Sequence, residues 1–307
     1  MEAHTRKLRY FVVLAGELHF SRAAARLHMS QQALSKHINE LEDEVGAALF
    51  DRSKRQIRLT VAGEVFLTAV QRSLAVLDEG ALQASRAALG EIGTLKVGAT
   101  VGAALELTEH ILAAFTEVAP DVQVELQEYS FGDRSAGLAS GDTDIAFVRR
   151  PIVTPDLDYF TLFVEPLAVA VHRDHRLADR YTVGVRDLAD EPIVVGRSTD
   201  ADAERFWTLG AYRDSSAPVV YASSTTEELL FVATGRCCMV TATASVRWQP
   251  HPYVRYLAIT DAPGSELAVA WPSGSDNPLV KKFISAARTA LERQAELIRQ
   301  IEQPSGF

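Results

Sequence analysis

Cysteine is scarce in this sequence, and long apolar runs are absent. The 307 residues include two cysteines, Cys237 and Cys238, and neighbouring residues of a strand point to opposite faces, which disfavours a disulfide between them. No apolar run approaches the roughly 20 residues of a membrane-spanning helix, and the first residues lack the apolar core of a signal peptide. We therefore expect a cytoplasmic protein with no membrane partner.

Motifs of metal-dependent, phosphate-binding or redox catalysis are also lacking. The sequence contains no HExxH, CxxC or Gly-rich phosphate loop, and its eight histidines are scattered. His172 and His175 have a spacing that metal sites use, but their position after an apolar run is more typical of a solvated loop. We expect no enzymatic activity, no cofactor and no metal site.

The net charge of −9 alone argues against a nucleic-acid partner, but the distribution of charge does not. Residues 1–66 carry 10 Lys and Arg against 8 Asp and Glu, a net charge of +2, and the remainder carries −11. Residues 21–39 contain three basic side chains and no acidic one. This local positive charge predicts moderate, salt-sensitive affinity for DNA per monomer and specific binding through two or more copies.

Between Leu18 and Thr60 the sequence has the spacing of a winged helix-turn-helix. Small apolar residues mark a first short helix, and Ser30 is a suitable N-cap for a second helix, whose apolar residues recur at i, i+4 and i+7. A hairpin with a basic turn, Ser53–Gln56, follows. The predicted buried stripe consists of Ala23, Ala24, Leu27, Leu34, Ile38 and Leu41.

The opposite face of the second helix is polar and suits double-stranded DNA. Its side chains can read base edges in the major groove, and basic residues of the hairpin can hold phosphates. The first residues of such a helix lie deepest in the groove. The predicted DNA contacts are Gln31, Gln32, Ser35, Lys36 and Asn39 on the helix and Arg52, Lys54 and Arg55 on the hairpin.

Residues Leu8–Gly63 resemble the N-terminal domain of LysR-type transcriptional regulators. The resemblance implies a sequence-specific regulator that binds a promoter operator with dyad symmetry. Gln32 departs from the proline of many relatives, and because glutamine can bind adenine, we expect this departure to affect which sequence is read. The matching positions are Leu8, Phe11, Phe20, Ala23–Ala24, Leu27, Ser30–Gln31, Ser35, Ile38, Leu41–Glu42, Gly46, Leu49–Phe50, Arg52, Leu59–Thr60 and Gly63.

A long helix without proline is predicted from Thr60 to about Leu89, with Leu89–Gly93 as a hinge. Its apolar residues recur at mixed steps of three and four, and the small first domain cannot cover them all. Pairing with a second copy of the helix is the favoured interpretation. The alternative is packing of the helix on the rest of its own chain, the effector domain predicted below. In the family that the chain resembles, this linker helix forms dimers, which commonly pair into a homotetramer.

Residues 94–302 alternate predicted strands and helices, which favours α/β subdomains with mostly parallel sheets. The layout, with the segments GDTDIAF, PLAVAVHRDHRLA and DLADEPIV, resembles the LysR-type effector domain, a two-lobed fold like that of periplasmic binding proteins. Helices are expected near 133–140 and over 279–301, the latter closing the first lobe and then projecting into solvent. The predicted domains are 1–60 for DNA binding, 61–91 for the linker helix and 92–307 for effector binding, with lobe 1 at about 92–163 and 266–302 and lobe 2 at about 164–260.

Residues after four predicted strands form a candidate ligand site, because ligands of open α/β sheets bind beyond the carboxyl ends of the strands. Thr100–Gly102 offers a hydroxyl and free N–H groups, and Arg149 can hold a carboxylate by two parallel hydrogen bonds. Relatives that sense aromatic acids have an effector-contacting arginine at about this place, which implies a small carboxylate effector. Arg149 as a surface ion-pairing residue and Thr100 as a helix cap are the alternatives. The predicted effector contacts are Thr100, Val101, Gly102, Tyr129, Arg149, Ser198, Thr199 and Thr225.

Other functions are compatible with parts of the sequence. A redox-sensing branch of the family draws attention to Cys237 and Cys238, but only Arg236 nearby would lower a thiol pKa, so we interpret both as packing residues. A regulator that binds a neutral ligand is a further alternative. A different class, a soluble α/β ligand-binding protein or enzyme whose first sixty residues only assemble oligomers, predicts no sequence-preferring DNA binding.

Overall fold

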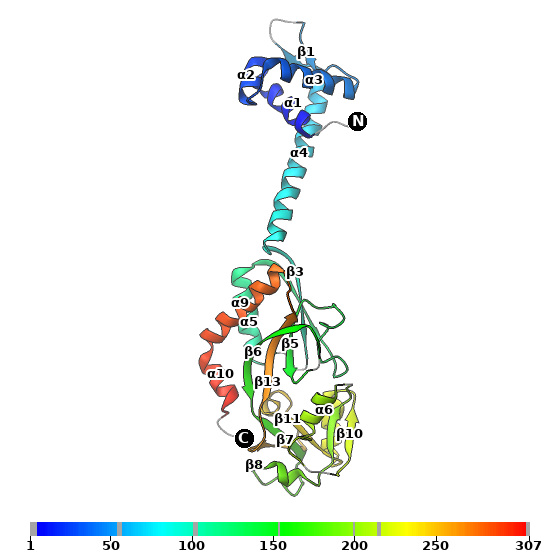
Figure 1. Ribbon diagram of the computed structural model, residues 1–307, viewed down its shortest axis with the longest axis vertical. Helices are drawn as coiled ribbons and strands as arrows, with labels where there is room; N and C mark the ends of the chain where they lie inside the picture. Colours follow the sequence, from blue (N-terminus) through cyan, green and yellow to red (C-terminus); the bar gives the residue numbers. More distant parts are fainter. Residues whose placement is uncertain are drawn as a thin grey trace. The chain divides into compact units, whose positions relative to one another are not determined.

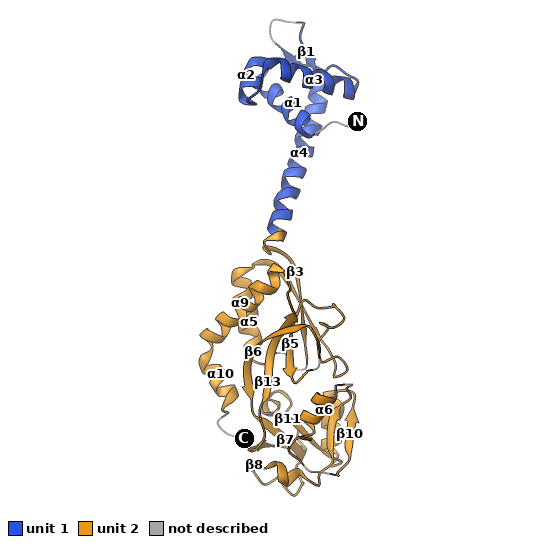
Figure 2. Cartoon of the chain, viewed as in Figure 1, with its two compact units in different colours: residues 1–86 blue, residues 87–307 orange. Residues whose placement is uncertain are grey.

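The computed structural model describes residues 5–53, 57–100, 104–152, 154–198, 200–213 and 216–304. The chain divides into two compact units, Met1–Arg86 and Ala87–Phe307 (Figure 2). None of the described helices is both long enough and apolar enough to cross a membrane.

The first unit contains three short helices, a two-stranded hairpin and a long helix (Figure 1). The predicted stripe forms its core together with Phe11 and Leu14, and Leu27 is partly buried at the edge. Ser30 caps the third helix as predicted, since its hydroxyl accepts a hydrogen bond from the Ala33 N–H at 3.2 Å. The elements are α1 Thr5–Glu17, α2 Phe20–Arg26, α3 Gln31–Val45, β1 Phe50–Asp51, β2 Arg58–Leu59 and α4 Val61–Ala88.

Helix α4 begins directly against the hairpin. The Thr60 hydroxyl accepts a hydrogen bond from the Gly63 N–H at 2.9 Å and donates one to the Ala48 carbonyl at 2.7 Å. A Cβ at Gly63 would lie 2.1 Å from the Leu49 carbonyl oxygen, so glycine is required for this close approach. The linker helix therefore starts where the sequence predicted it, capped by Thr60.

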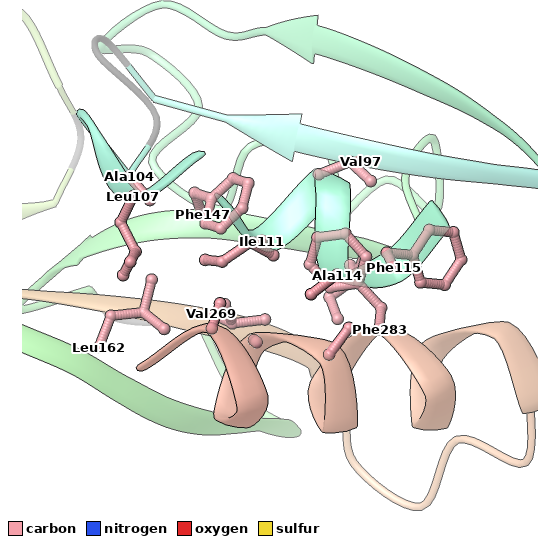
Figure 3. Close-up of a cluster of buried hydrophobic side chains, with 14 of the residues drawn as sticks. Val97, Ala104, Leu107, Ile111, Ala114, Phe115, Phe147, Leu162, Val269 and Phe283 are labelled. Carbon is pink, nitrogen blue, oxygen red and sulfur yellow. The ribbon is translucent and has the colours of Figure 1, made fainter. Parts of the chain in front are cut away.

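Lobe 1 of the second unit is a mixed sheet of five strands with helices on one face. Its elements are β3 Ile92–Ala99, α5 Leu107–Val118, β4 Asp121–Glu128, β5 Ile145–Arg150, β6 Leu157–Glu165, β13 Ser265–Pro272, α9 Pro278–Arg293 and α10 Ala295–Glu302. The strand order is β4-β3-β5-β13-β6, parallel among the first three and antiparallel at β13. The core between the sheet and helices α5 and α9 is built around Phe115, Phe147 and Phe283 (Figure 3).

Lobe 2 is a mixed sheet of six strands with a hydrophobic cluster on each face. Its elements are β7 Leu167–His172, β8 Thr182–Val183, the 3-10 helix η1 Val185–Leu188, β9 Ile193–Gly196, α6 Ala201–Trp207, β10 Val219–Ala222, α7 Thr225–Ala233, β11 Cys238–Ala242, α8 Ser245–Trp248 and β12 Val254–Ile259. The order is β10-β9-β11-β7-β12-β8, with β7 antiparallel to both of its neighbours. The chain crosses between the lobes after β6 and again before β13.

The structure corrects three expectations. Residues 133–140 form turns instead of a helix, because the Asp133 carboxylate binds the N–H groups of Ser135 and Gly137, and Ala136 and Gly137 have positive φ. The sheets are mixed instead of mostly parallel, since the prediction omitted β6 and did not foresee that the returning strand β13 runs antiparallel to it. The last helix breaks at Gln294, and α10 packs on β6 with Ile301 buried instead of projecting into solvent.

Candidate DNA-binding surface and effector pocket

Helix α3 presents the predicted polar face to solvent. Gln31, Gln32, Lys36 and Asn39 are exposed and Ser35 is half-buried, whereas Leu34, Ile38 and Leu41 on the opposite face are fully buried. Gln31 is already oriented, because its side-chain oxygen accepts a hydrogen bond from the Ser21 hydroxyl at 2.7 Å. The arrangement leaves a row of hydrogen-bonding groups of the kind that reads base edges.

The hairpin is attached to the end of the same helix by Glu42. One Glu42 carboxylate oxygen accepts hydrogen bonds from the Leu49 and Phe50 N–H groups at 2.7 and 3.0 Å. The other lies 2.6 Å from the Arg52 guanidinium, which also sits 5.3 Å from the centre of the Phe20 ring. Lys54 and Arg55, the other predicted wing contacts, lie outside the described residues. Glu42, which sequence reasoning did not assign, thus fixes the wing relative to the recognition helix.

Much of the apolar surface of α4 is uncovered in the single chain. Val70 is buried and Phe66, Leu67 and Leu74 pack partly against the core of the first unit. The exposed large apolar residues of α4 are Val61, Val65, Val76, Leu77 and Leu82. A stripe of this length is the feature that the sequence linked to a second copy of the helix.

A cavity of about 130 Å³ lies between the two lobes. Four predicted effector residues line it: Thr100 after β3, Tyr129 after β4, Arg149 on β5 and Thr225 at the start of α7. Ser198 is not part of the lining, but its hydroxyl accepts a hydrogen bond at 3.4 Å from Arg134, a lining residue. The predicted contacts Val101, Gly102 and Thr199 lie outside the described residues.

The cavity wall is mostly apolar. Lobe 2 contributes Val194, Val195, Trp207, Met239, Val240 and Ala242, and lobe 1 contributes Leu105 and Phe131. Two charged lining residues were missed from the sequence: Arg134, in the turns after β4, and Glu228, on α7. The rule that ligands bind beyond strand ends would have found Arg134 if it had been extended five residues past Tyr129. Nothing in the spacing of α7 distinguishes Glu228 from a solvent-facing residue.

Arg149 is engaged by a buried carboxylate. Its guanidinium lies 2.7 Å from Glu165 Oε2, donates to the Ser265 hydroxyl at 3.1 Å, and is 14% exposed against 1% for the Glu165 side chain. The other Glu165 oxygen accepts hydrogen bonds from the Thr243 hydroxyl and the Ala244 N–H. Glu165 and Ser265 stand at the two crossings between the lobes, so this cluster holds both crossings together at the base of the cavity.

Arg134 has no such partner. Among the described residues no carboxylate lies within ion-pair distance of its guanidinium, and Ser198 provides its one side-chain hydrogen bond. Burial lowers the pKa of Arg134, while Asp200 and Glu228 act at longer range to raise it. Partial burial of a guanidinium that no carboxylate contacts directly costs free energy, and an anion in the cavity would offset that cost.

Glu228 is buried in the wall of the same cavity, with 8% of the residue exposed. Burial raises the pKa of Glu228 to about 8, although Arg134 and a hydrogen bond from the Gly196 N–H both lower it. The carboxyl is therefore mainly neutral at pH 7. Arg134 is consequently the one positive charge of the described lining that no carboxylate contacts directly.

Further contacts join the lobes beside the cavity. Arg134 of lobe 1 reaches Ser198 of lobe 2, and the Phe131 ring lies over Gly196, where an added Cβ would be 2.3 Å from the ring atoms. Three buried polar atoms of the lining, Thr100 Oγ1, the Tyr129 hydroxyl and Gln249 Oε1, have no hydrogen-bond partner among the described residues. The buried Tyr129 hydroxyl faces Gly137, and burial raises its pKa.

Both cysteines are free and buried, and burial raises the pKa of Cys237 to about 11 and of Cys238 to about 12. Ligand atoms of His175, Glu191 and Cys238 lie within 4.8 Å of one another, a grouping that the sequence did not predict. Glu191 is already bound to His175 at 3.1 Å and to Arg176 at 2.8 Å. A protonated thiol and an occupied carboxylate are poor metal ligands, so this cluster is readily explained as an ion-pair network.

Comparison with known proteins gives the family. Residues 5–64 match the family described as "Bacterial regulatory helix-turn-helix protein, lysR family", and residues 88–292 match the "LysR substrate binding domain". The chain therefore belongs to the LysR family of transcriptional regulators: it is a DNA-binding regulator with an effector-binding domain, not an enzyme.

Full-length relatives have the same organisation. The chain is 30% identical over 297 residues to the transcriptional regulator AlsR of Bacillus subtilis (strain 168), covering 95% of this chain and 97% of AlsR. It is 31% identical over 303 residues to the Hca operon transcriptional activator HcaR of Escherichia coli (strain K12), covering 93% of this chain and 97% of HcaR. Full-length CbnR complexed with its target DNA has the same fold, with a TM-score of 0.67, 24% identity, and coverage of 94% of this chain and 99% of that one.

Proposed function

We propose that this regulator is controlled by a small carboxylate effector bound in the cavity between the lobes. The observation that carries the proposal is the half-buried Arg134 guanidinium, which lines a mostly apolar cavity without a carboxylate in ion-pair contact among the described residues. Charge-assisted hydrogen bonds from arginine to carboxylate are among the strong polar contacts in proteins.

The size of the cavity limits the effector. An apolar cavity of about 150 Å³ in another protein admits benzene, so about 130 Å³ suits a molecule of one ring or a short branched chain. Thr100, Tyr129, Arg149 and Thr225 are proposed contacts from the wall, and Ser198 acts by orienting Arg134. The segments of Val101–Gly102 and Thr199 adjoin these positions in the sequence and remain proposed contacts.

The proposed DNA-binding unit is a dimer in which the exposed stripes of two α4 helices pack together. Two such dimers pair into a tetramer. Two recognition helices related by a two-fold axis match an operator with dyad symmetry. The weak net positive charge of one DNA-binding domain supports the need for several copies. As a regulator of transcription the protein is proposed to act in the cytoplasm, where bacterial DNA is found.

The test measures effector binding and DNA binding together. Trp207 and Trp248 line the cavity, so binding of a carboxylate to the full-length protein should change tryptophan fluorescence. The same carboxylate should change the affinity or footprint on an operator selected from random DNA, because an effector shifts a regulator only through different affinity for its two states. The control is Val194→Trp, which fills the cavity from the lobe 2 wall: it should abolish the fluorescence response while leaving effector-free DNA binding intact. Carboxylate binding that survives Val194→Trp would contradict the location of the site.

A further inference from the structure

We infer that the cavity selects effectors with a single carboxylate, held by Arg134, and that ionisation of the neighbouring Glu228 weakens the binding of that carboxylate. The inference rests on the proposed function, since it names the class of ligand for that same cavity. It differs from the sequence-based expectation, which gave the role of carboxylate contact to Arg149.

The contacts of the two arginines decide between them. Arg149 has a carboxylate at 2.7 Å and a hydroxyl at 3.1 Å, so its charge is compensated before any ligand enters. Arg134 has one hydrogen bond of 3.4 Å to a neutral hydroxyl, and its remaining N–H groups have no side-chain acceptor among the described residues. An entering carboxylate therefore gains most at Arg134 and would have to compete with Glu165 at Arg149.

The number of charges sets the preferred charge of the ligand. Arg149 and Glu165 compensate each other, and Glu228 is mainly neutral at pH 7 because burial raises its pKa to about 8. One positive charge, that of Arg134, is left to face the ligand among the described lining residues. A monocarboxylate neutralises it, whereas a dicarboxylate would place a second negative charge against the apolar side chains of the wall, where burial is unfavourable.

Glu228 makes the affinity of the cavity for a carboxylate dependent on pH. Arg134 and the Gly196 N–H are the groups that favour its charged form, and the nearby Cys237 thiol is protonated because burial raises its pKa to about 11. Of the other ionisable side chains on the elements packed against α7, Tyr221 contacts Glu204, Tyr256 donates to the Gln249 carbonyl, and His172 accepts from the Asp174 N–H. Arg255 on β12 is exposed, and Cys238 packs in the cluster on the other face of the sheet. An ionised Glu228 would act as an internal anion near Arg134 and would repel the effector.

The experiment compares matched probes on the full-length protein. Benzoate and terephthalate differ by one carboxylate, benzamide is the neutral analogue of benzoate, and isovalerate and glutarate form an aliphatic pair. Binding is followed by tryptophan fluorescence and calorimetry. We expect at least one monocarboxylate to bind about tenfold or more tightly than its dicarboxylate and its amide, and to bind about fivefold or more weakly at pH 9 than at pH 7.

Three variants locate the effect. Arg134→Met should weaken the monocarboxylate about tenfold or more, while Arg150→Met, a neighbouring arginine that pairs with Glu266 outside the cavity, should leave binding unchanged. Glu228→Gln should retain binding at pH 7 and remove the loss at pH 9. Arg134→Met should also melt at the wild-type temperature or above, because it removes a partly buried charge that no described carboxylate contacts directly.

The outcomes separate the inference from the proposed function. Equal binding of the mono- and dicarboxylates, unchanged binding by Arg134→Met, or the same fall in affinity at pH 9 in Glu228→Gln would overturn the inference and leave a carboxylate regulator. A steep loss of melting temperature in Arg134→Met would also overturn it, because Arg134 would then be a structural ion-pair residue. If no carboxylate binds wild type at about 10 mM, the proposed function fails as well, since that limit corresponds to less than about 3 kcal/mol of binding free energy.

Discussion

Replacing Arg149 with methionine tests the cluster that joins the two crossings between the lobes. The variant keeps an unbranched apolar chain but removes the guanidinium, which leaves the Glu165 carboxylate, of which 1% is exposed, without its cation. Removing one partner of a buried ion pair costs about 3–5 kcal/mol, and the hydrogen bonds from Thr243 and Ala244 to Glu165 favour the lower end. For a unit of this size, about 3 kcal/mol corresponds to a melting temperature lower by about 6–12 °C.

All three tryptophans of the chain, at positions 207, 248 and 271, lie in the second unit, so their fluorescence reports its unfolding in the intact protein. Arg150→Met is the matched control: its partner Glu266 is part-exposed, and we expect a loss within about 1 kcal/mol. The double variant Arg149→Met with Glu165→Gln should recover part of the loss, because no charge remains buried. A melting temperature of Arg149→Met within about 2 °C of wild type would refute the reasoning, because Glu165 would then tolerate burial alone.

Three further predictions concern other parts of the chain. Burial raises the pKa of Glu228 to about 8 from 4.5, so between these pH values the folded state retains a proton that the unfolded state has released. As the pH rises, the free energy of unfolding of wild type should therefore fall by up to about 1.4 kcal/mol per pH unit more than that of Glu228→Gln. Urea titrations at several pH values measure this difference. Ser35→Ala should weaken binding to a selected operator by about 1–3 kcal/mol and leave non-specific DNA binding unchanged, and an equal loss on both DNAs in a gel-shift titration would refute its role in base reading. Leu77→Glu on the exposed stripe of α4 should shift the protein toward monomers in sedimentation velocity, whereas Gln83→Glu on the same helix should not; an unchanged distribution would mean that the α4 stripe is not the dimer contact.

The DNA-binding domain could be predicted from sequence because its information is local. The N-cap at Ser30, the buried stripe ending at Leu41 and the cap at Thr60 each depend on neighbours within a few residues, and the structure contains all three. The role of Glu42 was missed, since its bonds to Leu49, Phe50 and Arg52 depend on the angle at which the hairpin leaves the helix.

The cavity could be predicted only in part, because its chemistry depends on residues far apart in the chain. The strand-end rule identified Thr100, Tyr129, Arg149 and Thr225 as residues near one another. It could not reveal that Glu165, on a strand the prediction omitted, compensates Arg149. Arg134 was missed for a related reason, since its segment was predicted as a helix and adopts turns around the Asp133 carboxylate.

The attachment of the hairpin to the recognition helix through Glu42 has a consequence for how operators can change. Glu42 lies one turn beyond Asn39, the last residue of the polar face, and none of its bonds involves that face. Residues 31, 32, 35, 36 and 39 can therefore be exchanged without disturbing the bonds that attach the hairpin to the helix. Because the residues that hold the hairpin are separate from those predicted to contact bases, we expect a few substitutions on the polar face to give new target sequences while the hairpin keeps its place.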